Sequence, residues 1–371
     1  MRTSRVFAFR VAALVAASVL GLVLAEVGLR TWREWIRKSD QMDPGLIRYD
    51  SELGWALTPG WRGQHRHFDF EVAYEIGLDG FRREPEPPAG QSRGRVAVVG
   101  DSFTFGLGVS DADTFVSLLN RTSTNGLHFK NYGVPGYSTD QEVLLIEREV
   151  LPMSPTAVVL VVYLANDVVD NLLPVPVQGN LAKPFFETVN GQLVLHNSPV
   201  PKGGPASIRG QDGLASLVMG KPPSGHSVLG ALAGRFELGQ LWLRHTRAAD
   251  VSDSAFAPRL ERAVDRFDAI IGRLEAGCRK RGARLVLALL GGRSLFDDPK
   301  SLSASYQDYL RREIKRRIGS RIHLVDVLDW THSKGEVSAG RWFFAHDGHL
   351  TRAGHGVLSR CLAEAIIGVS D

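Results

Sequence analysis

Residues 157–164 read Ala-Val-Val-Leu-Val-Val-Tyr-Leu, and this run decides the fold. The run is apolar throughout and rich in β-branched valine, without the alternation of polar and apolar residues that marks a half-buried strand. Such a run is typical of a strand buried on both faces, as in a parallel sheet that helices cover on either side. We therefore expect these residues to form a core strand of such a sheet.

Further apolar runs predict strands of the same sheet. They occupy residues 95–100, 127–132, 284–290 and 322–327. Segments with the apolar spacing of amphipathic helices lie between or after them, at residues 114–119, 139–150, 258–281, 303–318 and 351–367. This alternation of strand and helix predicts an α/β fold, a doubly wound three-layer sandwich around a central parallel sheet.

The chain has 371 residues, of which 44% are hydrophobic and 23% charged, and these values fit one large globular domain with insertions. We divide it into an N-terminal membrane anchor or signal segment at residues 1–30, an approach segment at 31–94, and the α/β domain at 95–368. The approach segment contains short strand-like pieces, such as residues 68–74, and a turn signal at Asp79-Gly80.

An insertion at residues 171–253 interrupts the α/β domain. Asn190-Gly191 predicts a hairpin within it, and residues 228–244 predict an amphipathic helix. The insertion follows the strand at 157–164, so we expect it to start beside the carboxyl edge of the sheet. There it would form a wall or a lid over a bound substrate.

Composition also limits the possible functions. The net charge of +4 is modest and spread along the chain, so we do not expect a nucleic-acid partner. Cys278 and Cys361 are too few for a disulfide framework and lie in helical stretches, which predicts buried free thiols. No Cys/His cluster has the spacing of a zinc site. We expect neither a metal nor another cofactor.

The N-terminus predicts a membrane-spanning helix. Arg2, Arg5 and Arg10 precede an uncharged apolar run at residues 11–25, which then meets Glu26 and continues through Leu29. About 20 apolar residues span a bilayer, so this is a short span with one acid near its far end. The early arginines favour a cytoplasmic N-terminus, which places the remainder of the chain outside the cytoplasm. The alternative is a cleaved signal peptide, because residues 23–25 (Val-Leu-Ala) resemble a cleavage site.

Ser102 lies in residues 100–106, Gly-Asp-Ser-Phe-Thr-Phe-Gly, directly after the predicted strand at 95–100. Ligands of open parallel sheets bind beyond the carboxyl ends of the strands. Ser102 could offer its Oγ there as a nucleophile, or it could simply cap the following helix. A phosphate-binding loop would end in Gly-Lys-Ser/Thr, and no lysine follows here.

Two more polar blocks, at residues 131–138 and 163–167, follow the next two strands and reach the same edge of the sheet. Gly136 can bring its backbone N–H close to a substrate oxygen because it has no side chain. The side chain of Asn166 can donate a hydrogen bond to an oxyanion. The simpler roles are a plain turn for Gly136 and an Asx-turn for Asn166.

A histidine-rich block precedes the last predicted helix. His349 could take the proton of Ser102, and Asp347 could hold the imidazole in the required tautomer. Alternatively, Asp347 or Thr351 caps the helix. We expect the other histidines of this block, His346 and His355, to be surface or packing residues.

Together the four blocks resemble the SGNH (GDSL-type) hydrolase superfamily. Ser102, Gly136, Asn166 and His349 correspond to the four residues that name it, and the resemblance covers residues 95–367 apart from the insertion. It implies a flavodoxin-like sandwich, a serine nucleophile and no metal. It also implies an oxyanion hole formed by the N–H groups of Ser102 and Gly136 and by the side chain of Asn166.

The sequence departs from the superfamily pattern at one position. The usual motif places the catalytic acid three residues before the histidine, where this chain has His346. Asp347 stands two residues before His349 instead. Related exported enzymes that act on acetyl groups of polysaccharides have an Asp-x-His arrangement, which favours Asp347 as the acid.

These inferences predict a membrane-anchored serine esterase, single-pass in the cell membrane, with its catalytic domain outside the cytoplasm. Its substrate would be an acyl ester of a carbohydrate or lipid, with an O-acetylated envelope glycan as the leading candidate. Two alternatives stay open. One is an O-acyltransferase on the same scaffold, and the other is a catalytically silent protein that binds the cell envelope.

Overall fold

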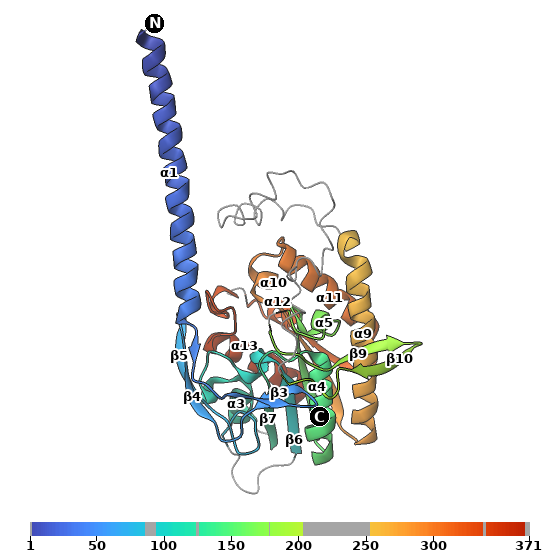
Figure 1. Cartoon of the computed structure of the whole chain (residues 1–371). Helices are drawn as coiled ribbons and strands as arrows, with labels where there is room; N and C mark the ends of the chain where they lie inside the picture. The colour runs from blue at the N-terminus through green and yellow to red at the C-terminus, as the bar shows by residue number, and fades with distance from the viewer. Residues whose placement is uncertain are drawn as a thin grey trace.

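The structure, a computed structural model, describes residues 2–85, 94–123, 126–177, 179–202, 253–336 and 339–367. Its body surrounds a five-stranded parallel sheet, and the long helix α1 (Arg2–Ser39) rises from one end of that body (Figure 1). The helix predicted at residues 228–244 lies outside the described residues.

The central sheet consists of the five runs that the sequence predicted as strands. They are β6 (Gly94–Gly100), β7 (Leu127–Gly133), β8 (Ala157–Tyr163), β11 (Arg284–Leu290) and β12 (His323–Asp326). Their order across the sheet is β12-β11-β8-β6-β7, and all neighbouring pairs are parallel. Read from β7 and renumbered along the chain, this is the flavodoxin-like order 2-1-3-4-5. The predicted fold class is therefore confirmed.

Alternate residues of each strand face two separate cores. In β8, Val159 faces one core and Leu160 the other, and both side chains are fully buried. Helices α3 (Phe115–Thr122) and α13 (Arg352–Ile367) cover the first face. The second is covered by α4 (Thr139–Leu145), α9 (Asp253–Lys280) and α11 (Leu302–Ile318). Burial on both faces explains why the run at 157–164 shows no polar alternation.

Short helices follow the carboxyl ends of the strands and begin the loops there. They are α2 (Ser102–Phe105), α5 (Asp167–Asp170), α10 (Arg293–Asp297) and α12 (Val327–Ser333). Single 3-10 turns occupy Asp111–Asp113, Leu151–Met153 and Ala339–Arg341. Loops at this edge are where an open parallel sheet binds its ligands.

The approach segment forms small antiparallel sheets beside the body. One contains β1 (Gln41–Met42), β4 (Arg62–His67) and β5 (Phe70–Glu75), and another pairs β2 (Ile47–Asp50) with β3 (Gly54–Leu57). The insertion contributes the predicted hairpin, in which β9 (Phe185–Val189) and β10 (Gln192–His196) flank Asn190-Gly191. The turn at Asp79-Gly80 is also present, with Gly80 at a φ of 82°.

Two predicted helices have different bounds in the structure. Helix α4 ends at Leu145, and Ile146–Val150 continues as a π-helical turn that keeps its apolar residues buried. Helix α9 begins at Asp253, so Pro258 lies inside the helix and not at its start. Proline removes one backbone hydrogen bond there. The buried apolar face that follows, which includes Phe267, holds the helix against the core.

Helix α1 has the properties of a membrane span. The most apolar 18-residue window of its segment Phe9–Ile36 has a mean hydropathy of 2.2, and none of that window is buried against the body. A signal sequence has the same length and composition, so both predicted roles of this segment agree with the structure.

A buried arginine from the approach segment fixes the loop that follows Ser102. The guanidinium of Arg82 is fully buried and donates to the carbonyls of Phe105, Gly106 and Val109 at 2.5–2.7 Å. Its Nε donates to Asp111 at 2.7 Å. Four acceptors thus converge on one planar cation, a geometry that lysine cannot reproduce.

Arg82→Met should destabilise the protein by about 3–5 kcal/mol, because it leaves Asp111 and three carbonyls without their buried donor. Arg82→Lys should restore little of this loss. Urea unfolding measures the change, with Arg83→Met as the matched control because Arg83 is exposed and pairs with Glu75 at the surface. Equal stability of the two methionine variants would contradict the role given to Arg82.

Candidate active site

Ser102 is placed by a sharp turn from strand β6 into helix α2. The turn requires glycine at position 100, because a Cβ there would lie 2.2 Å from Oγ1 of Thr104. Asp101 is the helix cap, and its carboxylate accepts a hydrogen bond from the N–H of Phe103 at 2.9 Å. The capping role considered for Ser102 is therefore filled by Asp101, and the hydroxyl of Ser102 is left to bond elsewhere.

His349 and Asp347 complete a chain of two hydrogen bonds that ends on Ser102. The Oγ of Ser102 lies 2.7 Å from Nε2 of His349, and Nδ1 of the same ring lies 2.7 Å from Oδ1 of Asp347. The tautomer with its proton on Nδ1 satisfies both bonds, since it donates to the carboxylate and accepts from the hydroxyl. The structure thus brings together the three residues predicted as nucleophile, base and acid.

The carboxylate of Asp347 is held in its ionised form. Burial opposes ionisation, but the ring and the backbone N–H of His349 both donate to the carboxylate, and together they lower its pKa below the usual value. Helix α13 is capped by a different residue, Thr351, whose Oγ1 accepts from the N–H of Gly354 at 3.3 Å. The helix-cap role considered for Asp347 is therefore taken by Thr351.

His346, at the position where the superfamily pattern places its acid, points to a residue that the sequence did not single out. Its ring Nδ1 lies 2.8 Å from Oδ1 of Asp69, in the turn between β4 and β5. The backbone N–H groups of His346 and Asp347 both donate to the other oxygen of Asp69, at 2.7 and 2.9 Å. Partial burial acts against ionisation, but these three bonds lower the pKa of Asp69. Asp69 thereby anchors the loop that carries Asp347 and His349.

Gly136 and Asn166 follow β7 and β8, the neighbours of β6 in the sheet, so they lie at the same edge as Ser102. Gly136 has a φ of 81°, a conformation that favours glycine, and Trp55 packs against it. Asn166 is buried and stands at the start of α5 without capping it. Its Oδ1 is buried without a hydrogen-bond partner among the described residues, and its amide NH2 can donate to a ligand.

Aromatic rings hold the imidazole from one side. Phe103, the residue after Ser102, packs against His349 with ring centroids 4.7 Å apart. Tyr163, at the end of β8, stacks on the other side of Phe103 at 4.0 Å. This packing restricts the His349 ring to the orientation in which both of its nitrogens are bonded.

Several carboxyl groups lie fully buried near this edge, and the sequence analysis missed them as a group. Three of them are Asp101, Glu142 and Asp167. Burial raises the pKa of Asp101 to about 6. Burial and the neighbouring acids raise the pKa values of Glu142 and Asp167 well above their usual range. Neither carboxyl oxygen of Glu142 has a hydrogen-bond partner among the described residues, so no hydrogen bond offsets the burial that disfavours its ionised form.

The raised pKa of Glu142 predicts a pH-dependent stability. Its folded-state pKa exceeds the ordinary 4.5, so the protein loses stability as pH rises from that value through the folded pKa. Glu142→Gln keeps the shape of the side chain but cannot ionise. It should therefore reduce the fall in melting temperature between about pH 5 and pH 8.

Glu149→Gln is the matched control for this measurement, because its carboxyl is half exposed and bonded to Arg148. That variant should keep the pH dependence of the unaltered chain. An unchanged pH dependence in Glu142→Gln would show that Glu142 does not carry a buried proton.

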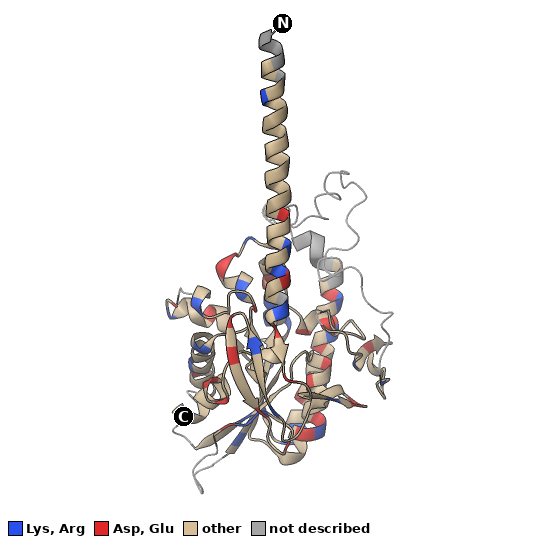
Figure 2. Ribbon diagram, turned by 60° about the vertical axis from the view of Figure 1, so that its left-hand side comes forward, with Lys and Arg blue, Asp and Glu red and all other residues tan. Residues whose placement is uncertain are grey.

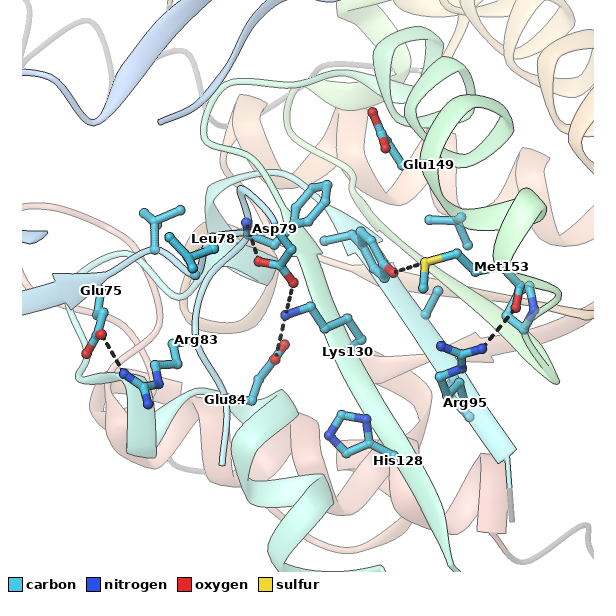
Figure 3. A pocket seen from close by; sticks show the side chains of 18 of the residues that line it. Glu75, Leu78, Asp79, Arg83, Glu84, Arg95, His128, Lys130, Glu149 and Met153 are labelled. Carbon is cyan, nitrogen blue, oxygen red and sulfur yellow. Dashed lines mark hydrogen bonds and ion pairs between the residues drawn. The ribbon is translucent and has the colours of Figure 1, made fainter. Parts of the chain in front are cut away.

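A large cavity lies away from these residues. It has a volume of about 840 Å³ and is lined by the starts of β6 and β7, at the end of the sheet opposite to Ser102. Inside it Lys130 bonds to both Asp79 and Glu84, at 2.9 and 3.1 Å (Figure 3). Ser102, Asp347 and His349 do not line this cavity. Among the described residues, no group of three or more His, Cys, Asp or Glu is placed to hold a metal ion.

Comparison with known proteins gives structural likenesses only, since no family model and no curated protein sequence matches the chain. One solved structure is LAE5, an alpha/beta hydrolase from the metagenome of Lake Arreo, Spain. It has 13% identity and a TM-score of 0.40, over 76% of this chain and 98% of that one. An acetylxylan esterase of Geobacillus stearothermophilus has the same identity and TM-score, over 74% and 94%.

A third similar structure is a lipolytic protein of the G-D-S-L family from Desulfitobacterium hafniense. It shares 12% identity at a TM-score of 0.40, over 74% of this chain and all of that one. The matches thus include esterases and members of the family that the four sequence blocks resemble. Matches with such low identities and TM-scores do not show which substrate or reaction this chain has.

Proposed function

We propose that this chain is a serine ester hydrolase of the SGNH type. The observation that carries the proposal is the pair of 2.7 Å hydrogen bonds from Ser102 to His349 and from His349 to Asp347. A serine next to a base that a carboxylate orients in turn is the arrangement that makes a hydroxyl nucleophilic at neutral pH.

The reaction has two steps, formation and hydrolysis of an acyl-enzyme, and the same three residues act in both. Oγ of Ser102 attacks the ester carbonyl while Nε2 of His349 takes the hydroxyl proton, and the alcohol leaves with that proton. Water then attacks the acyl-enzyme and gives a proton to His349, which returns it to Ser102 as the carboxylic acid leaves. Asp347 stays ionised and stabilises the imidazolium between these steps.

The oxyanion of both tetrahedral intermediates would be bound at the carboxyl edge of the sheet. The donors are the backbone N–H groups of Ser102 and Gly136 and the side-chain amide of Asn166. Each such donor typically contributes about 2.7–4 kcal/mol of transition-state stabilisation. The positive φ of Gly136 and the buried position of Asn166 at the start of α5 support these roles, because they hold both donors at this edge before substrate binds.

The substrate would be an acyl ester of a carbohydrate or lipid in the cell envelope, with an O-acetylated glycan as one candidate. Helix α1 supports this assignment, since it would hold the catalytic domain on a membrane. The insertion at residues 171–253 begins after α5 and would form one wall of the substrate site.

Ser102→Ala and His349→Ala should each remove nearly all hydrolysis of p-nitrophenyl acetate, and the double variant should lose little more. Both residues act in one proton transfer, and units of this kind are strongly non-additive. Asp347→Asn should lower kcat less than Ser102→Ala does, with an unchanged melting temperature. Additive losses, or a normal kcat in Asp347→Asn, would contradict the triad.

The topology can be tested independently of the chemistry. A reporter enzyme that is active only outside the cytoplasm, fused after Asp371, should be active because the early arginines favour a cytoplasmic N-terminus. A cytoplasm-specific reporter at the same position is the control. The reverse pattern of activities would overturn the assignment to the outer side of the membrane.

A further inference from the structure

The end of helix α1 touches the loop that carries the catalytic histidine. Trp32 and Trp35, in its last turns, pack against Phe68 with ring centroids 5.7 and 5.0 Å apart. Phe68 in turn lies edge-on to His346 at 4.7 Å, and Trp32 reaches the same ring at 6.4 Å. We call Trp32, Trp35, Phe68 and His346 the juxtamembrane cluster.

The juxtamembrane cluster is still largely open to solvent. Trp32 is 46% exposed, Trp35 53% and Phe68 39%, although all three rings contact one another. Large aromatic side chains rarely stay this exposed in a soluble protein without a partner. Tryptophan at the end of an apolar helix is typical of the lipid headgroup layer, where its ring is half in water and half in lipid.

The length of the helix places Trp32 in that layer and Trp35 just beyond it. Charge returns to α1 at its base, after a long uncharged stretch (Figure 2). Trp32 follows Leu29 by three residues, and Trp35 follows it by six. At 1.5 Å per residue they lie about 4.5 and 9 Å beyond Leu29 along the axis. The headgroup layer is roughly 5–7 Å thick on each side of the hydrocarbon core.

The catalytic edge of the sheet faces the same way. Asp69 joins the Phe68 turn to the backbone of His346 and Asp347, and Asp347 joins His349 and Ser102. Helices α5 and α10, which follow the carboxyl ends of β8 and β11, lie toward the end of the body from which α1 rises (Figure 1). Only a few side chains therefore separate the headgroup layer from the catalytic histidine.

We propose that Trp32 lies in the headgroup layer, with the rest of the juxtamembrane cluster at its outer edge, and that Ser102 opens onto the membrane surface. The substrate is then an acyl ester held at that surface by a lipid anchor, and it enters sideways from the bilayer. This choice of substrate rests on the proposed ester hydrolysis, whereas the position of the cluster does not.

The position is measured on the full chain in phosphatidylcholine vesicles. A single reactive cysteine is labelled with a fluorophore at Phe68→Cys, within the cluster, at Glu71→Cys, three residues further along the chain in β5, or at Met153→Cys. The native Cys278 and Cys361 are buried and should not react. Met153 precedes β8, so the seven residues of that strand put it about 23 Å from the catalytic edge.

Lipids with a nitroxide on the headgroup should quench the label at position 68 or 71 several-fold more than at 153. Glu71→Cys keeps the aromatic cluster intact and guards against misfolding of Phe68→Cys. Equal quenching at all three positions, or stronger quenching at Met153→Cys, would overturn the proposed orientation.

The substrate class is measured with an acetyl ester of a sugar that is linked to a diacylglycerol. When this lipid shares the vesicle with the enzyme, hydrolysis should be at least about tenfold faster than when it is in separate vesicles, because both are confined to one surface. Equal rates would overturn the lipid-anchored substrate, as would hydrolysis of only the same acetyl sugar without a lipid.

The two measurements separate the two proposals. If neither ester is hydrolysed but the labels near the cluster are quenched, the ester chemistry is wrong and the orientation stands. If both esters are hydrolysed at similar rates and the labels are not quenched, the chemistry stands and the orientation is wrong.

Discussion

The hydrogen bond between Ser102 and His349 joins two loops that are 247 positions apart in the chain, and the rest of the site keeps its two ends in place. Ser102 is held by the cap that Asp101 provides and by Arg82, which bonds the carbonyls of the following loop. The other end is held by Asp69 through the backbone of the histidine loop. A shift in any of these contacts would separate Ser102 from His349.

Much of the fold could be predicted because its signals are local. A strand buried on both faces, such as the run at 157–164, is apolar at every position, and an amphipathic helix repeats with its own period. The same approach found Ser102, Asp347 and His349, because catalytic residues of an open sheet follow strand ends or precede a helix in short polar blocks. The sequence predicted helix bounds less well. No local signal marks the point where α4 passes into the π turn at Ile146–Val150, and none shows that α9 starts before Pro258.

Asp69 and Arg82 could not be predicted, because they act on distant segments. Asp69 bonds to His346, 277 positions away, and Arg82 bonds to residues 23–29 positions away. Neither Asp69 nor Arg82 lies in a recognisable sequence motif. The sequence shows that His346 stands where the superfamily pattern has its acid, but it does not show why. His346 bonds to Asp69 and packs against the aromatic end of α1, and the carboxylate that bonds His349 stands one position later, at Asp347. The loop of His349 and the end of helix α1 thus share one set of side chains.

The central claim is that Ser102 is a nucleophile activated by His349. It is tested most directly by treating the full chain with a fluorophosphonate and locating the modified residue by mass spectrometry. We expect one adduct, on Ser102, formed fast in the unaltered chain and nearly absent in His349→Ala. An adduct on another residue, or equal labelling of Ser102 in both proteins, would contradict this account.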